Sequence, residues 1–334
     1  MLTPSQAVQP SSAPLVSMLV ICYNQARFVV ETLESVKAQT YKDTELIIVD
    51  DCSTDDSVAV IERWLTENRI QCTFIRHQKN QGVCRSLNDA LAVATGKYIS
   101  EIAADDLWLP DKIERQVAIM ESQPDSVGVL YSDAFQIDEN GCPSPGMFVA
   151  AHRDLPEMPQ GQILNTLLEG NFIPGMTTLI RRDCYGQVGT YDENLPWEDW
   201  DMWMRIARHY SFLYSSTPSA KYRFHGQSYS HSDPARMYKD SFKISVKQFR
   251  LGSLTEEQKS TLAGTMMNCA REVYSRNDPE TTNVLLDLWQ TTGNKRARLM
   301  YWSSRLGVSL RTLQRVYALR LRFRHLPARL LKSQ

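Results

Sequence analysis

The sequence predicts an α/β fold, in which a doubly wound, mostly parallel sheet is flanked by helices and followed by a mostly helical C-terminal extension. Strand-like apolar runs and helical patterns alternate four times with short links between them, as in doubly wound sheets. Several of the strand-like runs are continuously apolar, as expected of strands that helices cover on both faces. Beyond about Asp233 the pattern becomes mostly helical.

The elements of the first half follow from apolar periodicity and from the residues at their boundaries. The helix over 26–40 has Phe28 and Leu33 on one side, and Gly96 ends the helix over 82–96. Pro110 stands near the start of the helix over 109–122, a position that tolerates its missing N–H. The predicted strands are 15–24, 44–51, 72–77, 97–104 and 126–138, and the predicted helices are 26–40, 53–68, 82–96 and 109–122.

The second half is less regular. Residues 144–161 are rich in Pro and Gly and predict a loop over the sheet edge. Apolar patterns after this loop predict two further helices and three short strands. The helices are 162–171 and 198–210, and the strands are 177–182, 211–216 and 220–226.

Composition and charge bound the class of protein. The chain has 334 residues, of which 43% are hydrophobic and 22% charged, as in ordinary globular proteins. The formal net charge of −1 conceals an asymmetry, because residues 288–334 carry eleven Lys or Arg and no Asp or Glu. A basic segment after an acidic body indicates an anionic partner for that segment.

The cysteines and the apolar runs indicate a cytoplasmic protein. The seven cysteines are scattered, and no C-x-x-C occurs, which argues against disulfides and structural zinc. The N-terminus lacks the pattern of a secretory signal, and no apolar run is long enough to predict a transmembrane helix. No glycine-rich phosphate loop follows the first strand, which disfavours a dinucleotide-dependent oxidoreductase.

Polar residues follow three of the predicted parallel strands at their carboxyl ends. Tyr23 follows the first strand, Asp50-Asp51 ends the second, and Asp105-Asp106 follows the fourth. Ligands of open α/β sheets bind at this edge. Carboxylates gathered there would raise each other's pKa unless a cation is bound. Mg²⁺ or Mn²⁺ takes one or two carboxylates and completes its shell with substrate phosphates.

Helix capping is the alternative explanation for these acidic residues. Asp55 and Asp56 precede a helical pattern and suit an N-cap position. Asp106 has the same alternative, although capping explains several carboxylates on one sheet edge less well. The sequence therefore predicts a metal–diphosphate site at the carboxyl edge of the sheet.

Three stretches resemble a known family. They are "VSMLVICYNQARFVVETLESVKAQTYKDTELIIVDDCSTDDS", "NQGVCRSLNDALAVATGKYISEIAADDLW" and "GNFIPGMTTLIRRDCYGQVGTYDENLPWEDWDMWMRIA". Their order and spacing resemble family 2 glycosyltransferases with the GT-A fold, over about residues 15–230. The resemblance implies an inverting enzyme, and the absence of a Q-x-x-R-W motif favours a non-processive one.

The resemblance implies roles for the donor-side residues. Tyr23 and Asp51 would flank the base of a nucleotide-sugar. Asp105 matches the last carboxylate of the family's D-x-D motif, which holds the metal bridging the diphosphate. Asp106 would lie near the ribose or the sugar, and Arg85 would face the diphosphate or the sugar unless it belongs to a solvated helix face. The first carboxylate of the motif falls at Ala103, so one ribose or metal contact is missing.

The resemblance also implies an acceptor side around "LPWEDWDMWMRIA". Asp199 matches the acceptor-side carboxylate, and a carboxylate there can take the proton of the attacking hydroxyl. Trp197 and Trp200 would offer faces for sugar stacking, with core packing as the alternative. Glu198 would bind the acceptor or support the loop.

Two of the matching residues, His225 and Asp199, also have structural alternatives. Arg223 and His225 match the family's R-x-H, and His225 would be a metal ligand or a diphosphate contact, or else structural. Asp199 has helix capping as its alternative.

The extent of the resemblance and the helical pattern after it predict the domain organisation. We expect a flexible leader at 1–14, a GT-A catalytic domain at 15–232 and a helical, basic extension at 233–334. The nucleotide-sugar half of the catalytic domain would span about 15–135, and its acceptor half about 136–232.

The C-terminal extension alternates basic and apolar residues. Its apolar side is predicted as Leu306, Leu310, Leu313 and Tyr317, with Arg311, Arg315 and Arg322 on another side. A basic amphipathic helix predicts contact with the inner membrane surface, which suits a lipid-linked acceptor. The alternative is a solvated helix that packs on the acidic catalytic domain. Nucleic-acid binding is disfavoured because the body of the chain is acidic.

The function expected from these residues is transfer of one sugar from a UDP- or dTDP-linked donor to a hydroxyl of a glycan or glycolipid acceptor. The setting implied by the resemblance is bacterial surface polysaccharide or lipopolysaccharide assembly. Two alternatives stay open: a catalytically idle nucleotide-sugar-binding protein, which Ala103 makes conceivable, and a nucleotidyltransferase, which would need a basic glycine-rich loop that is absent.

Overall fold

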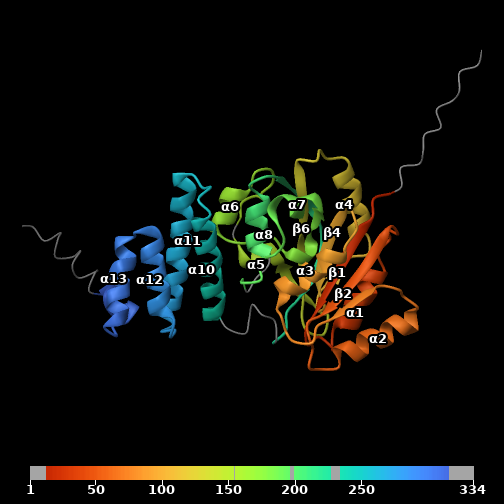
Figure 1. Cartoon of the computed structure of the whole chain (residues 1–334), viewed down its shortest axis with the longest axis horizontal. Helices are drawn as coiled ribbons and strands as arrows, with labels where there is room; N and C mark the ends of the chain where they lie inside the picture. Colours follow the sequence, from red (N-terminus) through yellow and green to blue (C-terminus); the bar gives the residue numbers. More distant parts are fainter. Residues whose placement is uncertain (1–12, 154, 196–198, 227–233, 316–334) are drawn as a thin grey trace, which may run out of the picture. The chain divides into compact units, whose positions relative to one another are not determined.

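The computed structural model describes residues 13–153, 155–195, 199–226 and 234–315 (Figure 1). These residues form two compact units. The first lies within Met1–Ile163 and Phe172–His225, and the second lies within Leu164–Asn171 and Gly226–Gln334. The leader expected at 1–14 and the boundary expected between 232 and 233 fall largely on residues outside the described ranges.

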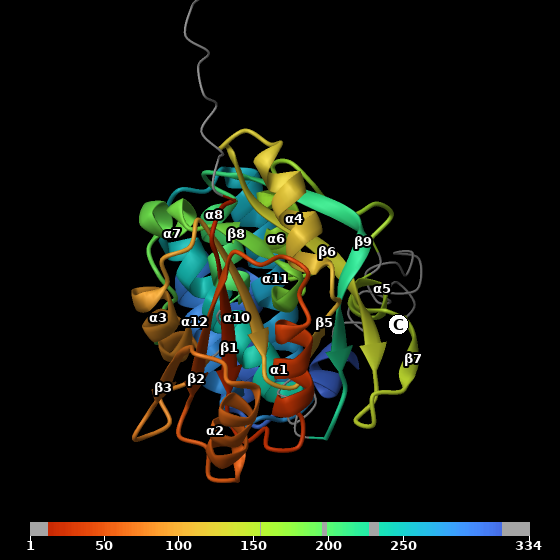
Figure 2. The ribbon, with the colours of Figure 1, turned by 90° about the vertical axis from the view of Figure 1, so that its right-hand side faces the viewer.

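The first unit is built on one mixed sheet, in which the described residues form nine strands. Their order is β3-β2-β1-β4-β8-β6-β9-β5, and β7 pairs with β6. In Figure 2, β3, β2 and β1 follow one another across the sheet. The strands are β1 (Val16–Cys22), β2 (Thr44–Asp50), β3 (Thr73–Arg76), β4 (Tyr98–Ala103), β5 (Leu107–Trp108), β6 (Val127–Ile137), β7 (Pro143–Met147), β8 (Leu179–Arg181) and β9 (Ser211–Arg223).

Parallel pairs dominate the part of the sheet that contains β1 to β4. β1 pairs in parallel with both β2 and β4, and β2 pairs in parallel with β3. β8 lies antiparallel between β4 and β6, while β6 and β9 form a long parallel pair. The predicted mostly parallel α/β sheet is therefore confirmed.

Helices cover the sheet. The helices of the first unit are α1 (Val29–Lys37), α2 (Ser57–Asn68), α3 (Val83–Val93), α4 (Lys112–Glu121), α5 (Phe148–His152), α7 (Asp183–Val188) and α8 (Asp199–Ile206), with the 3-10 turn η1 (Gly175–Thr177). The apolar residues of α1, α2 and α4 share one buried cluster with alternate residues of β1, such as Met18 and Val20. α3 packs against β1 and β2 with other buried residues, as expected of a helix that covers the opposite face.

Two predictions for the irregular half were wrong. The strands expected at 211–216 and 220–226 form one strand, β9, because a register shift against β6 absorbs the residues around Pro218. In β9, Ser215 and Ala220 pair with residues only two positions apart in β6, so the intervening residues bulge. The expected loop at 144–161 contains β7 and α5.

The described residues of the second unit are helical, as expected. The helices are α6 (Leu164–Glu169), α10 (Pro234–Arg250), α11 (Glu256–Ser275), α12 (Thr281–Thr292) and α13 (Lys295–Arg305). Thr255 and Gln258 form a reciprocal capping box at the start of α11. A separate apolar core with Met266, Leu285 and Met300 joins α10 to α13. Among the described helices, none is long and apolar enough to cross a membrane.

Candidate active site

The carboxyl ends of β1, β2 and β4 meet at one edge of the sheet. Cys22 is the register partner of Asp50, and Ile21 is the partner of Ala103. Tyr23, Asp51 and Asp105 follow these strand ends, so the expected grouping of polar residues is confirmed. Tyr23 is 44% exposed at this edge, which leaves it accessible to a planar ligand.

Asp51 is held inside the protein. Its side chain is buried, and its Oδ1 accepts from the backbone N–H of Gln81 at 2.8 Å and lies 2.7 Å from His77 Nδ1. Its Oδ2 accepts from the Gly82 N–H at 2.8 Å, immediately before α3. Asp51 thus fixes the segment that enters α3, and its contact with a nucleobase stays a prediction. His77, which the sequence did not single out, also lies 3.1 Å from Asp89 Oδ2.

The positive group opposite Asp105-Asp106 is Arg223, at the end of β9. Its buried guanidinium donates from Nε to the Asp105 carbonyl oxygen at 2.8 Å and from Nη2 to Glu31 Oε2 at 2.7 Å. The Arg223 backbone N–H donates to Asp106 Oδ1 at 2.9 Å. Arg223 therefore fastens the loop between β4 and β5 from a position more than one hundred residues away in the chain.

The buried Asp106 side chain accepts the hydrogen bond from the Arg223 backbone N–H. Burial raises the pKa of Asp106 well above its usual range, and the charge of Asp105 adds to the rise. The Arg223 N–H and guanidinium act in the opposite direction. Its predicted place near the ribose or the sugar stays a prediction, while its observed partner is the backbone of Arg223.

Asp105 and His225 form a pair that could hold a divalent cation. His225 Nε2 lies 2.9 Å from Asp105 Oδ2, and the same oxygen accepts from Gln25 Nε2 at 3.1 Å. The His225 ring packs on Phe28 with centroids 4.8 Å apart, and the Arg223 guanidinium lies 4.9 Å from the centroid of the same Phe28 ring. In the R-x-H motif, Arg223 thus holds the loop that carries Asp105, and His225 contacts the Asp105 carboxylate.

The chemistry of this pair fits Mg²⁺ or Mn²⁺. One carboxylate oxygen and one imidazole nitrogen are ligands that such ions accept, and the rest of their shell is usually water and phosphate oxygen. No group of three or more His, Cys, Asp or Glu ligands occurs among the described residues. Ala103 contributes no donor at the position where the motif has its first carboxylate.

The predicted acceptor side contains a second pair of carboxyl groups, Glu101 and Asp199. Asp199 is the first residue of α8, is half-buried, and accepts from the backbone N–H of Trp200 at 2.6 Å. The pKa of Glu101, on β4, is raised to about 7, mainly by burial and also by the charge of nearby Asp199, while a hydrogen bond from Tyr191 opposes the rise. The Tyr191 hydroxyl donates to Glu101 Oε2 at 2.7 Å.

The three acceptor residues around Asp199 have different outcomes. Trp197 and Glu198 lie outside the described residues. Trp200 is buried, and its ring is part of the interior of the first unit. Its sugar-stacking role stays a prediction, and the observed burial agrees with the core-packing alternative.

α3 holds the segment that leads to Asp199. Asn88 Nδ2 donates to the carbonyl oxygen of Tyr191 at 3.0 Å and to Glu193 Oε1 at 2.9 Å, and its Oδ1 accepts from the Tyr191 N–H at 2.9 Å. Arg85 pairs with Asp89 at 3.1 Å and with Glu193 at 3.4 Å. Arg85 thus faces this segment, and its contact with a diphosphate stays a prediction.

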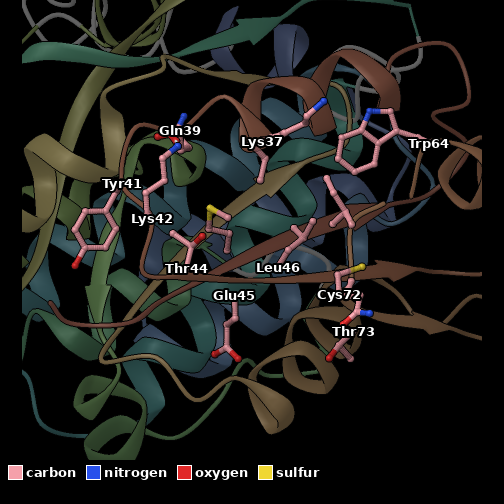
Figure 3. Close-up of a pocket in the computed structure, with 14 residues that line it drawn as sticks. Lys37, Gln39, Tyr41, Lys42, Thr44, Glu45, Leu46, Trp64, Cys72 and Thr73 are labelled. Atoms are coloured by element: carbon pink, nitrogen blue, oxygen red, sulfur yellow. The ribbon is translucent and has the colours of Figure 1, made fainter. Parts of the chain in front are cut away.

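A cavity of about 580 Å³ lies elsewhere in the same unit (Figure 3). Thr44 and Thr73, the first residues of β2 and β3, line it together with Trp64 and Lys37. These are the amino ends of parallel strands, opposite to the edge that carries Asp51 and Asp105. The cavity is therefore separate from the candidate active site.

Comparison of the chain with known proteins gives relatives that are named as glycosyltransferases. The family model described as glycosyl transferase family 2 matches residues 17–188. The putative glycosyltransferase EpsE of Bacillus subtilis is 31% identical over 203 residues, which are 59% of this chain and 68% of EpsE. An uncharacterized glycosyltransferase of Rickettsia felis is 30% identical over 251 residues, 73% of this chain. The chain spans only 39% of that longer protein.

A third relative has a specific name. It is UDP-Glc:alpha-D-GlcNAc-diphosphoundecaprenol beta-1,3-glucosyltransferase WfaP of Escherichia coli, 38% identical over 109 residues. These residues are 33% of this chain and 42% of WfaP.

Solved structures share the fold. The S. aureus TarS 1-349 complex with UDP-GlcNAc superposes with a TM-score of 0.61 at 19% identity, covering 88% of this chain and 92% of TarS 1-349. The Pyrobaculum calidifontis mannosyltransferase PcManGT, in complex with GDP-Man and Mn²⁺, gives a TM-score of 0.59 at 19% identity. That match covers 91% of this chain and 83% of PcManGT. The expected GT-A fold is confirmed, and the chain belongs to glycosyltransferase family 2.

Proposed function

We propose that the chain is an inverting, metal-dependent enzyme that moves one sugar from a UDP- or dTDP-linked donor to a hydroxyl of a glycan or glycolipid acceptor. The observation that carries this proposal is the Asp105–His225 pair, 2.9 Å apart, at the sheet edge where Tyr23 is exposed. The names of the relatives support the substrate classes. TarS binds UDP-GlcNAc, PcManGT binds GDP-Man with Mn²⁺, and WfaP acts on a diphosphoundecaprenol-linked sugar.

The donor would lie across the carboxyl edge of β1, β2 and β4. Tyr23 would stack on the base, and Asp51 would accept from its ring N–H. Asp105 and His225 would hold Mg²⁺ or Mn²⁺, which when bound neutralises charge on the leaving diphosphate. Arg85 and Asp106 complete the proposed donor side.

The acceptor hydroxyl would be activated by Asp199. A carboxylate within hydrogen-bond reach can take the hydroxyl proton while the donor sugar passes through an oxocarbenium-like transition state. A base on the face opposite the leaving diphosphate directs the hydroxyl to attack from that face. The new bond to the sugar forms there while the bond to the diphosphate breaks, so the anomeric centre is inverted. Neutral Glu101, favoured below pH 7 by its raised pKa, would add no second negative charge beside Asp199. Trp197 and Glu198 would contact the acceptor glycan.

The setting we propose is assembly of bacterial surface polysaccharide or lipopolysaccharide at the inner face of the membrane. The basic C-terminal helices would bring a cytoplasmic enzyme to its lipid-linked acceptor, since Lys and Arg near an anionic leaflet are attracted to it. Nucleic acid plays no part in the proposal.

Calorimetry with UDP, dTDP and GDP, with and without Mn²⁺, tests the donor site. We expect Mn²⁺ to strengthen nucleotide binding in the natural sequence, and Asp105→Ala and His225→Ala to lose that strengthening. His209→Ala changes an exposed histidine in the turn after α8 and serves as the matched control. Absence of nucleotide binding in the presence of Mn²⁺ would contradict the proposal.

Two other outcomes distinguish the alternatives. A nucleotide affinity that is the same with and without Mn²⁺ would favour a metal-independent enzyme, in line with the missing carboxylate at Ala103. Metal-dependent binding without turnover of any donor would favour a catalytically idle nucleotide-sugar-binding protein.

A further inference from the structure

Three large apolar side chains are exposed together at α13. Leu299 is 51% exposed, Trp302 is 49% exposed, and Leu306, the residue that ends the helix, is 79% exposed. Their spacing of three and four residues puts them on one side of a helix. The opposite side of α13 is buried in the core of the second unit, where Ala297 and Met300 pack. The exposed row is therefore not a poorly packed part of that core.

The border of this row is basic. Lys295, Arg296, Arg298 and Arg305 are all exposed on the same helix. No acidic residue follows Asp287 anywhere in the chain. We call Leu299, Trp302 and Leu306 with these four basic residues the α13 face.

The α13 face corrects the side expected from sequence alone. Leu310 is buried and Leu313 packs against the same core, so these two leucines belong to the interior. Leu306 is the one residue of the expected apolar side that is exposed within the described range, and Tyr317 lies outside that range. The apolar row that reaches solvent is therefore Leu299, Trp302 and Leu306, which lies nearer the start of the C-terminal extension than expected.

Charge decides between the occupants that this face could take. Residues 316–334 carry five Lys or Arg and no acidic residue, so they would bring like charge to a basic border. A second copy of the face would do the same. A nucleic acid would match the charge but has no apolar layer to receive Leu299 and Leu306.

An anionic bilayer matches both parts of the face. Apolar side chains enter the acyl boundary, tryptophan favours the interfacial layer, and Lys and Arg reach anionic headgroups. We propose that α13 is an interfacial membrane anchor, which docks on an anionic lipid surface with Leu299, Trp302 and Leu306 inserted and the basic residues at the headgroups. This proposal rests on the proposed function for its setting, but it concerns a surface that takes no part in sugar chemistry.

Flotation of the full chain with lipid vesicles tests the anchor. We expect binding to vesicles of phosphatidylcholine mixed with phosphatidylglycerol, weak binding to phosphatidylcholine alone, and loss of binding as salt rises. Leu299→Gln combined with Trp302→Ser should lower the partition coefficient at least about tenfold. Arg296→Gln combined with Arg305→Gln should lower it by roughly twenty-five-fold, at about fivefold per charge.

The control and the contrary results are equally specific. Leu251→Gln changes a leucine at the end of α10 that is also 51% exposed, and it should leave vesicle binding unchanged. Equal binding to both vesicle types, or unchanged binding by both α13 variants, would overturn the proposal. So would loss of binding only when Arg320, Arg322 and Arg324 are changed to Gln. A concentration-dependent dimer that Trp302→Ser dissolves would identify a second copy as the occupant instead.

Nucleotide calorimetry on the same variants separates the two proposals. The α13 variants should bind nucleotide like the natural sequence, because the face contains none of the proposed donor residues. If the natural sequence binds nucleotide but not vesicles, only the membrane-anchor proposal is refuted. Vesicle binding without nucleotide binding would remove the proposed function and leave the anchor intact.

Discussion

Replacing Glu101 with glutamine should stabilise the protein at high pH and change its stability little at low pH. Glu101 is 6% exposed and lies next to Asp199. Burial, assisted by the charge of Asp199, raises the pKa of Glu101 from 4.5 to about 7. Glutamine has almost the same shape, carries no charge, and its amide oxygen can accept the Tyr191 hydrogen bond.

The sign of the pH dependence follows from proton binding. Between pH 4.5 and 7 the folded protein keeps the Glu101 proton, whereas the unfolded chain releases it. The folded state binds more protons in this window, so the free energy of unfolding falls as pH rises through it. A pKa difference of this size corresponds to about 3 kcal/mol between the two ends of the window. Glutamine removes this loss.

Urea unfolding at pH 5 and pH 8 measures the effect. At pH 8 we expect the free energy of unfolding of Glu101→Gln to exceed that of the natural sequence by about 3 kcal/mol. At pH 5 the two should agree within about 1 kcal/mol. Glu67→Gln, at an exposed position of α2, should show no such difference. An advantage of the same size at both pH values, or a less stable variant at pH 8, would refute the reasoning.

Three further predictions follow from contacts in the first unit. Asp199→Asn should lower turnover by about 10²–10⁴-fold without loss of donor binding, because the amide cannot take a proton; near-normal turnover in a donor-hydrolysis or transfer assay would end its role as base. Asn88→Ala removes three hydrogen bonds to the segment before Asp199 and should cost roughly 1–3 kcal/mol in urea unfolding while lowering kcat more than donor affinity; equal effects on both would indicate a general loss of structure. Gly96→Ala places a Cβ 2.7 Å from backbone and side-chain atoms of β1 and should destabilise by about 1–3 kcal/mol, whereas Gly186→Ala enters open space; equal stability of the two variants would contradict the packing described.

The regular part of the fold could be predicted because its pattern is local. Continuous apolar runs and helical spacing identify strands and helices from neighbours in the chain, although α3 ends at Val93, before the Gly96 that was expected to end it. The continuity of β9 could not be predicted in the same way, because the bulge within it depends on its register with β6. The sequence pattern predicted two strands, 211–216 and 220–226, where one strand continues.

The site was predictable as a set of strand ends but not as a set of contacts. Tyr23, Asp51 and Asp105 share an edge because parallel strands end together. The contact of Arg223 with the Asp105-Asp106 loop joins residues far apart in sequence, and no local pattern announces it. Glu101 was missed because it lies inside an apolar run, where a single charged residue gives no periodic signal.

Side-chain direction was the other source of error. Leu310 stands in an amphipathic pattern that suits either an exposed face or a core face, and it is buried. An amphipathic pattern tells that a helix has two faces, but the neighbours that cover each face come from distant parts of the chain.

The most direct test of the proposed enzyme is release of nucleoside diphosphate from a panel of UDP-, dTDP- and GDP-linked sugars. The natural sequence should hydrolyse at least one donor slowly when Mn²⁺ is present and lose this activity when the metal is removed. Asp105→Ala should lower the rate by at least about a hundredfold with that donor. Equal rates for Asp105→Ala and the natural sequence, or hydrolysis of no donor with Mn²⁺ present, would contradict the account.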